Sequence, residues 1–301
     1  MPMLDATPRV SVVMAVKNYP FHLAEAIEGI LAQSMDSWEL VVVDYGSTDG
    51  ETLEIVRSCE DTRVRLVEWP GLTLPGASNV GLAMARGEYI ARHDADDVSH
   101  PTRLATQVAF LEDHPDVDVL GTGYSVVGPT DRPITVSSRE WRHELIDRHM
   151  PWMCCVCHGT VMARAEVFDS HVYNERMTAA LDYGLWLSIL TARYHRMHVI
   201  PDVLYTMHRH DGSITSTRRM WQFACAHSAR EWHLRGREVP PERALLELMT
   251  RRGRAWRRWR LRHHIHAMWS ERGWRRMASA LRVALTRPDY FALEYRKWRS
   301  W

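Results

Sequence analysis

Strand-like and helix-like segments alternate through about the first 125 residues of this chain. Residues 10–16 (VSVVMAV) and 38–50 (WELVVVDYGSTDG) contain valine-rich runs typical of buried strands, and residues 22–34 repeat apolar side chains at helical spacing. Further strands are expected at 63–69, 88–93 and 116–128, and further helices at 52–59, 78–87 (closed by Gly87) and 101–115. This alternation predicts an α/β fold with a mostly parallel sheet sandwiched by helices.

Ligands of such sheets bind beyond the carboxyl ends of the strands. Asp44 and the cluster Asp94, Asp96 and Asp97 both follow strand-like runs, so we expect them to share one crevice. Three carboxylates this close repel one another and raise one another's pKa values. A divalent cation would remove the repulsion and could bridge to phosphate oxygens. The alternative is a solvated loop that caps the helix beginning at 101.

Four segments then occur in an order and at spacings that resemble the inverting family-2 glycosyltransferases: SVVMAVKN, ELVVVDYGSTD, SNVGLAMARGEYIARHDADD and PTRLATQVAFLEDHPDV. The resemblance spans about residues 9 to 216 and implies a GT-A fold. It also implies a nucleotide-diphosphate sugar donor and Mg²⁺ or Mn²⁺ held by Asp96 with help from Asp94. Such an ion neutralises the charge that builds on the departing diphosphate. Asp97 is expected to orient the loop or to cap the next helix.

The same resemblance implies a nucleotide pocket. Its residues are Ala15, Val16, Asn18, Asp44, Tyr45, Asn79, Asp94 and Ala95. Tyr45 stands where the family usually has a second aspartate, and it could stack on the base instead. A UDP-sugar is the favoured donor, and dTDP and GDP stay open. Asn79 has a second interpretation, as a helix cap.

The segment ALDYGLWLSIL resembles the family's acidic motif, and this match implies that Asp182 is the general base that deprotonates the acceptor hydroxyl. Leu181 and Gly184 replace acidic residues common in relatives. The alternative is that Asp182 merely starts a helix and that Trp186 packs in the core. The matching positions imply that His158, Trp186 and His208 contact the acceptor or the donor sugar, and that His210 could ligate the metal.

Charge divides the chain. Residues 1–217 carry 17 Lys and Arg against 30 Asp and Glu, a net charge of −13, whereas residues 218–301 carry 21 against 7, a net charge of +14. We expect a GT-A catalytic domain at 1–217, with a nucleotide half at 1–100 and an acceptor half at 101–217. A basic helical extension rich in Trp and Arg would follow at 218–301.

The extension has three interpretations. Residues 251–285 could dock on an anionic membrane surface, where Arg meets phosphate and Trp lies at the headgroup level. They could equally fold back on the acidic body. Nucleic acid is the least favoured partner.

The expected location is cytoplasmic, with peripheral attachment to the inner membrane face as an option. Five cysteines do not suggest a disulfide framework, no basic region precedes the first apolar run, and no apolar run approaches the roughly 20 residues of a membrane span.

The predicted activity is that of a metal-dependent glycosyltransferase of the hexosyltransferase type, acting on a carbohydrate or lipid-linked acceptor in the synthesis of surface polysaccharide or glycolipid. Two alternatives remain. The stretch DADDV also fits the nucleophile motif of haloacid-dehalogenase-type phosphatases, with Asp94 as the phosphorylated residue. The altered positions Tyr45, Leu181 and Gly184 would also suit a catalytically degenerate sugar-nucleotide-binding protein.

Overall fold

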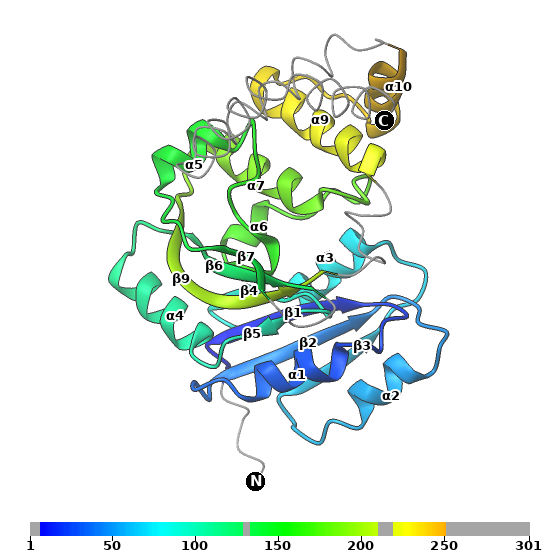
Figure 1. The fold of residues 1–301 in the computed structure, drawn as a ribbon, viewed down its shortest axis with the longest axis vertical. Helices are drawn as coiled ribbons and strands as arrows, with labels where there is room; N and C mark the ends of the chain where they lie inside the picture. Colours follow the sequence, from blue (N-terminus) through cyan, green and yellow to red (C-terminus); the bar gives the residue numbers. More distant parts are fainter. Residues whose placement is uncertain (1–6, 129–132, 210–218, 251–301) are drawn as a thin grey trace, which may run out of the picture. The chain divides into compact units, whose positions relative to one another are not determined.

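The computed structural model describes residues 7–128, 133–209 and 219–250 (Figure 1). The chain divides into two units, residues 1–246 and 247–301, and the sheet and the candidate site belong to the first. Within the described ranges, no helix is long and apolar enough to cross a membrane.

The first half of the sheet is parallel, in the order β3-β2-β1-β4 (Figure 1). Val16 of β1 lies opposite Asp44, and Val13 lies opposite Arg92, so the carboxyl ends of β2 and β4 meet at one edge. The strands are β1 (Val10–Val16), β2 (Trp38–Asp44), β3 (Val64–Glu68) and β4 (Tyr89–Arg92).

Helices cover both faces of these strands because the buried strands are apolar on both sides. Val12 and Met14 share a core cluster with Leu23, whereas Ala15 packs with Ala77. The helices are α1 (Leu23–Leu31), α2 (Glu51–Arg57), α3 (Leu74–Met84) and α4 (Arg103–Asp113). The predicted α/β fold is therefore confirmed.

The second half of the sheet mixes strand directions. β8 is antiparallel to β4 and to β6, whereas the long, curved β9 is parallel to β6 and antiparallel to β5 (Figure 1). A hairpin partner, β7, pairs with β6. The strands are β5 (Val98–Ser99), β6 (Val119–Val127), β7 (Pro133–Ser137), β8 (Met162–Arg164) and β9 (Met197–His208).

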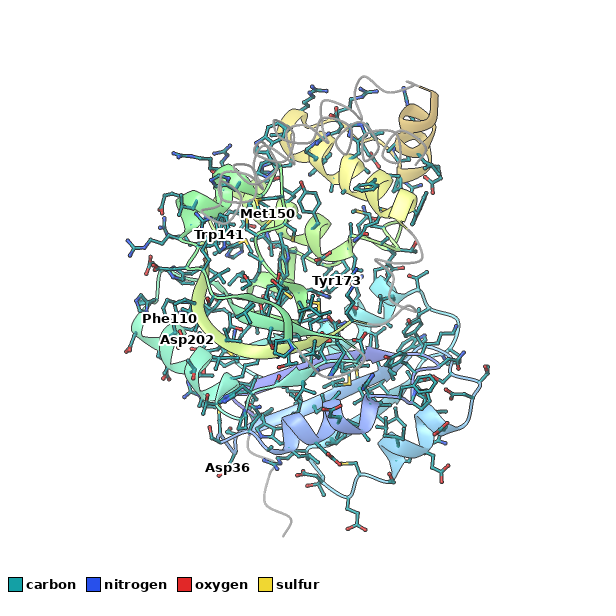
Figure 2. The ribbon with its side chains drawn as sticks, in the orientation of Figure 1. Asp36, Phe110, Trp141, Met150, Tyr173 and Asp202 are labelled. Carbon is teal, nitrogen blue, oxygen red and sulfur yellow. The ribbon has the colours of Figure 1, made fainter. Side chains whose placement is uncertain are left out.

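A second core cluster lies around α7 and includes Trp141 and Met150, which are labelled in Figure 2. Cys225 and Ala229 of α9 belong to it, and the indole nitrogen of Trp221 donates to the hydroxyl of Thr178 at 2.9 Å. The helices are α5 (His143–His149), α6 (Val167–Ser170), α7 (Leu181–Ala192), α9 (Arg219–Arg235) and α10 (Pro241–Thr250), with a 3₁₀ turn, η1, at His158–Thr160.

The predicted domain boundary at 217 falls outside the described residues and stays a prediction. The chain just beyond it, in α9, packs against α7 within the first compact unit.

One predicted helix has different ends. The helix expected at 78–87 begins at Leu74 instead, because the Thr73 hydroxyl accepts from the backbone N–H of Gly76 and caps it. It ends at Met84, so Gly87 does not close it. Gly87 is required by packing: a Cβ there would lie 2.6 Å from the backbone nitrogen of Ser11.

Candidate active site

Asp94 is the first carboxylate after β4, and a buried arginine holds it. Arg92, whose side chain is 6% exposed, donates from Nη2 to Asp94 Oδ1 at 2.9 Å. The backbone N–H of Asp94 donates to the Tyr205 hydroxyl at 3.1 Å. Burial acts to raise the pKa of Asp94, but the positive charge of Arg92 outweighs it, so the pKa is lowered. Asp94 therefore stays ionised.

Asp96 and Asp97 are attached to the end of β9 through His208. The His208 backbone N–H donates to Asp97 Oδ1 at 2.9 Å, and His208 Nδ1 lies 2.7 Å from the carbonyl oxygen of Asp96. Asp97 is buried, and burial together with the charges of Asp96 and Asp94 raises its pKa well above the ordinary value. The structure thus supports the loop-orienting role predicted for Asp97, with β9 as the partner.

Asp182 lies in the first turn of α7, which follows a left-handed Ala180 (φ 49°). Burial raises the pKa of Asp182 to about 6, and the negative charge of Asp94 acts in the same direction. The residue both begins a helix and belongs to the electrostatic environment of the aspartate loop. A carboxyl group with this pKa can take up a proton near neutral pH.

His158 lies between Tyr173 and Asp94. Its Nε2 lies 2.7 Å from the Tyr173 hydroxyl, and its Nδ1 lies 3.8 Å from Asp94 Oδ1. Burial lowers the pKa of His158 to about 3, so the ring is neutral. Trp186 packs beneath it, with ring centroids 6.2 Å apart. Trp186 is only 1% exposed and its indole nitrogen lacks a hydrogen-bond partner, which favours packing over the predicted sugar contact.

The predicted nucleotide residues of the first two strands organise one turn. Asp44 accepts from the backbone N–H groups of Gly46 (3.0 Å) and Ser47 (3.1 Å) and from the Ser47 hydroxyl. Asn18, at φ 50°, accepts from the Thr48 N–H at 2.7 Å. Both side chains fix the 45–48 turn beside the ends of β1 and β2. Their contacts with a nucleotide stay a prediction.

The remaining pocket residues lie close by. Ala15 and Val16 are buried at the end of β1, and Ala95 is buried in the main core cluster. The ring of Tyr45 lies 5.5 Å below the Lys17 ammonium group, so a cation already occupies one side of the ring proposed for base stacking.

Asn79 has a structural task that neither predicted role describes. Its side-chain amide donates to the Tyr173 carbonyl at 2.9 Å and accepts from the Tyr173 N–H at 2.8 Å. It lies inside α3 rather than at its N-cap, which is Thr73. Asn79 therefore positions the tyrosine that bonds to His158. His210 lies outside the described residues.

Two buried arginines were missed by the sequence analysis. Arg103 is fully buried and donates to Gln107 Oε1 (3.0 Å), Ser99 Oγ (2.9 Å) and the Arg92 carbonyl (2.9 Å). Burial lowers its pKa to about 10. The available signal was Arg92 itself, a charge inside the apolar strand segment YIARH. The sequence does not show which acid pairs with Arg92, since Asp94 is only one of several nearby acids.

The carboxylates suit a hard dication. Asp97 is buried with a negative neighbour on the same loop, and only one oxygen of Asp94 is occupied by Arg92. Oxygen ligands of this kind are those that Mg²⁺ and Mn²⁺ prefer. The charge of an ion would offset the repulsion between Asp96 and Asp97.

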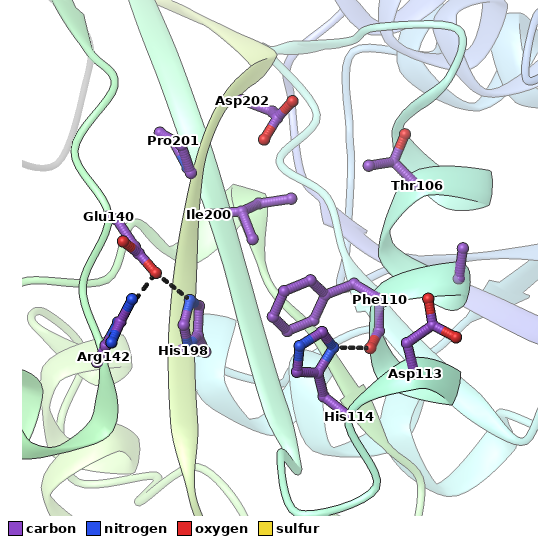
Figure 3. A pocket seen from close by; sticks show the side chains of 11 residues that line it. Thr106, Phe110, Asp113, His114, Glu140, Arg142, His198, Ile200, Pro201 and Asp202 are labelled. Atoms are coloured by element: carbon purple, nitrogen blue, oxygen red, sulfur yellow. Dashed lines mark hydrogen bonds and ion pairs between the residues drawn. The ribbon is translucent and has the colours of Figure 1, made fainter.

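A cavity of about 700 Å³ lies elsewhere, between α4 and β9 (Figure 3). Phe110, His114, Ile200 and Pro201 line it, and the side chains of Glu140 and His198, which lie 3.4 Å apart, close one side. None of the predicted site residues lines this cavity, so its size does not make it the reaction centre.

Comparison with known proteins agrees with the geometry. The model of glycosyl transferase family 2 matches residues 11–172. The putative glycosyltransferase EpsE of Bacillus subtilis is 36% identical over 212 residues, covering 67% of this chain and 73% of that protein. The O-antigen biosynthesis glycosyltransferase WbnJ of Escherichia coli is 29% identical over 186 residues, covering 60% and 71%. The chain belongs to glycosyl transferase family 2.

Solved structures show the same fold. S. aureus TarS 1–349 in complex with UDP-GlcNAc has a TM-score of 0.60 at 20% identity, covering 81% of this chain and 72% of that chain. The mannosyltransferase PcManGT of Pyrobaculum calidifontis, in complex with GDP-Man and Mn²⁺, has a TM-score of 0.58 at 22% identity, covering 98% and 84%. These matches confirm the GT-A-like fold. They give no support to the phosphatase alternative, and Asp94 follows β4 rather than the first strand.

Proposed function

We propose that this chain is an inverting, metal-dependent glycosyltransferase of the hexosyltransferase type. The observation that carries the proposal is Asp182: a carboxyl group with a pKa of about 6, in the same electrostatic environment as Asp94. In this proposal the aspartate loop holds the leaving group, and Asp182 accepts a proton from the acceptor.

The donor side depends on the aspartate loop. Asp96, with the free oxygen of Asp94, would hold Mn²⁺ or Mg²⁺, and His210 could add a ligand. When bound, the ion acts as a Lewis acid that neutralises charge on the departing diphosphate. Arg92 keeps Asp94 ionised and fixes one of its oxygens, and His208 holds the backbone of Asp96 in place.

The acceptor side depends on Asp182. Its carboxylate would take the proton of the acceptor hydroxyl while that oxygen attacks the anomeric carbon on the face opposite the diphosphate. Attack from that face inverts the configuration. Neutral His158, held by Tyr173, would orient sugar hydroxyls through hydrogen bonds without adding charge.

A UDP-sugar is the donor that we propose first. TarS is a fold relative bound to UDP-GlcNAc, and PcManGT is one bound to GDP-Man, so both bases belong in the test. For the acceptor we propose a carbohydrate or lipid-linked hydroxyl in surface polysaccharide synthesis. The likeness to WbnJ, named for O-antigen biosynthesis, supports this class.

For the extension we propose an anionic membrane surface as the partner of residues 251–285, which would place the enzyme at the inner membrane face. The support is compositional: residues 218–301 carry 21 Lys and Arg against 7 acids, and eight of the 13 tryptophans lie after residue 220. Vesicle flotation with and without anionic lipid tests this directly. Equal recovery on neutral vesicles would contradict it.

Nucleotide release from a panel of UDP-, GDP- and dTDP-sugars with Mn²⁺ tests the main proposal. We expect one nucleotide class to be released, and the matching nucleotide to raise the melting temperature in proportion to the logarithm of its concentration. No release and no thermal shift across the panel would favour the degenerate binding-protein alternative.

A further inference from the structure

A group of metal-ligand side chains lies beside the aspartate loop, and two of its members, His22 and Glu25, have no role in the proposed reaction. His22, Glu25 and His208 each offer one ligand atom, and these atoms lie within 4.8 Å of one another. The rings of His22 and His208 are stacked, with centroids 4.6 Å apart and planes 5° apart. His22 Nδ1 lies 3.6 Å from Glu25 Oε2.

The chain prepares this group from two elements. His22 directly precedes α1 and Glu25 lies in its first turn, so their spacing of three residues brings them to one face. His208 ends β9.

The tautomer of His208 follows from its partner. The carbonyl oxygen of Asp96 can only accept, so the His208 Nδ1 at 2.7 Å must carry the proton. In the neutral ring, Nε2 then keeps its lone pair. Histidines that bind metals usually donate the other ring N–H to a carbonyl or a carboxylate in this way, which fixes the ring and makes the ligand more basic.

We propose that His22, Glu25 and His208 form a binding site for a borderline transition-metal dication, with Zn²⁺ as the best match. Two imidazoles and one carboxylate with an open fourth position form a known zinc ligand set. The site is distinct from the carboxylate corner formed by Asp94 and Asp96. Nitrogen ligands favour Zn²⁺ over Mg²⁺, which prefers oxygen.

One adjustment is needed for three ligands to reach one ion. Because the two imidazole planes are nearly parallel, their lone pairs do not yet converge. His22 is the ring that can turn: its side chain is 34% exposed, whereas His208 is held by Asp96. Rotation of an imidazole about χ2 meets only a broad, shallow preference.

Zinc at this site would have a structural consequence for the reaction centre. His208 bonds to the backbone of Asp96 and to the carboxylate of Asp97. An ion shared with His22 and Glu25 would fasten the aspartate loop to the beginning of α1. The inference does not depend on the proposed transferase activity, because binding can be measured without any donor.

The test is calorimetric titration with Zn²⁺. The full chain is first stripped of metal and then placed in buffer with saturating Mg²⁺. The His22→Ala and Glu25→Gln variants should each lose one Zn²⁺ site, or weaken it by about 10–100-fold or more. Both side chains are at least a third exposed, so the fold should tolerate the changes. Zinc bound by other histidines remains in all variants and cancels in the comparison.

Matched controls are Glu28→Gln, an exposed acid one turn further along α1, and His114→Ala, an exposed histidine of the α4 end. Both should titrate like the unaltered chain. Crystals soaked in zinc should show an anomalous peak among His22, Glu25 and His208. Titrations identical for His22→Ala and the unaltered chain, or zinc peaks only at other positions, would overturn the proposal.

Discussion

The acids at the two ends of the parallel strands differ in their hydrogen-bond donors and in the direction of their pKa shifts. At the amino end, Glu39 of β2 has a side chain only 2% exposed. It accepts from Ser11 Oγ (2.6 Å), Arg65 Nη1 (2.7 Å) and Arg86 Nη2 (2.8 Å). Burial acts to raise the pKa of Glu39, but these donors lower it below the ordinary value.

At the carboxyl end, donors compensate the acids less fully: at Asp97, burial outweighs the hydrogen bond from the His208 backbone. Arg92 bonds to Asp94, whereas the pKa of Asp97 is raised well above its ordinary value and that of Asp182 is raised to about 6. The comparison teaches that a buried acid stabilises the fold where donors surround it. Where fewer donors compensate its burial, it is available to a ligand or a proton, at a cost in stability.

The largest effect should come from Asp96→Ala. Loss of the proposed metal ligand should lower sugar transfer by at least about 10³-fold, because charge on the leaving group is no longer neutralised. Nucleotide affinity should also stop depending on Mn²⁺. Transfer assays and thermal shifts with and without Mn²⁺ measure both, and a variant with normal metal dependence would remove Asp96 from the role.

Asp182→Asn should lower kcat by about 10²–10⁴-fold, because the amide cannot accept the proton. Nucleotide affinity should stay near that of the unaltered chain. The melting temperature at pH 8 should not fall, since the variant removes a poorly compensated buried charge. A variant that keeps most of its kcat would refute the assignment as base.

The dependence of kcat on pH should report the titration of Asp182. A raised pKa keeps Asp182 protonated up to about pH 6, so the fraction of active base grows as pH rises. Below pH 6, kcat should fall about tenfold per pH unit, and above pH 7 it should level off. A profile that is flat from pH 5 to 8 under conditions where chemistry limits the rate would contradict the proposed titration.

Glu39→Gln should act on the other end of the sheet. Hydrogen bonds to a charged group are worth about 1.5–3 kcal/mol, and Arg65 and Arg86 are partly exposed and can return to water. We therefore expect the free energy of unfolding to fall by about 2 kcal/mol, measured by urea denaturation, with kcat unchanged at 25 °C. A loss of activity without a loss of stability would break the contrast between the two ends.

The smallest effect should follow Tyr173→Phe, which removes only the hydroxyl that bonds to His158. We expect about 1 kcal/mol less stability and a change in transfer of no more than about tenfold. If His158 contacts a sugar, KM should rise more than kcat falls. If KM and kcat are the same in the variant and in the unaltered chain, His158 has only a packing role.

The order of strands and helices could be predicted from sequence because burial on both faces produces valine-rich runs such as residues 10–16. The aspartate cluster was found because Asp94, Asp96 and Asp97 are neighbours in the chain. By contrast, Tyr173 and His158 are 15 residues apart, and Asn79 and Tyr173 are 94 apart. Such contacts depend on how η1, α3 and the loop before α7 pack together, which no local pattern encodes.

Burial was also hard to foresee. Trp186 matched a sugar-contact position, yet its ring fills the second core cluster. No local pattern marks His22 as a candidate ligand, because its partner His208 comes from β9 and is 186 positions away in the sequence. Arg92 lies in a buried strand and Arg103 begins α4, and both are buried. Only the structure shows the oxygens that Arg92 and Arg103 bind.

The two hydrogen bonds between the Asn79 side chain and the backbone of Tyr173 have a practical consequence for protein engineering. They join α3 to the segment that holds His158 through Tyr173. Chimeras that exchange residues 1–100 for those of a relative with another donor would carry their own residue at position 79. Only an incoming segment with an amide at that position would keep the hydrogen bonds to Tyr173. We therefore expect α3 and the Tyr173 segment to stay aligned in such a chimera and to lose that alignment in a chimera without the amide.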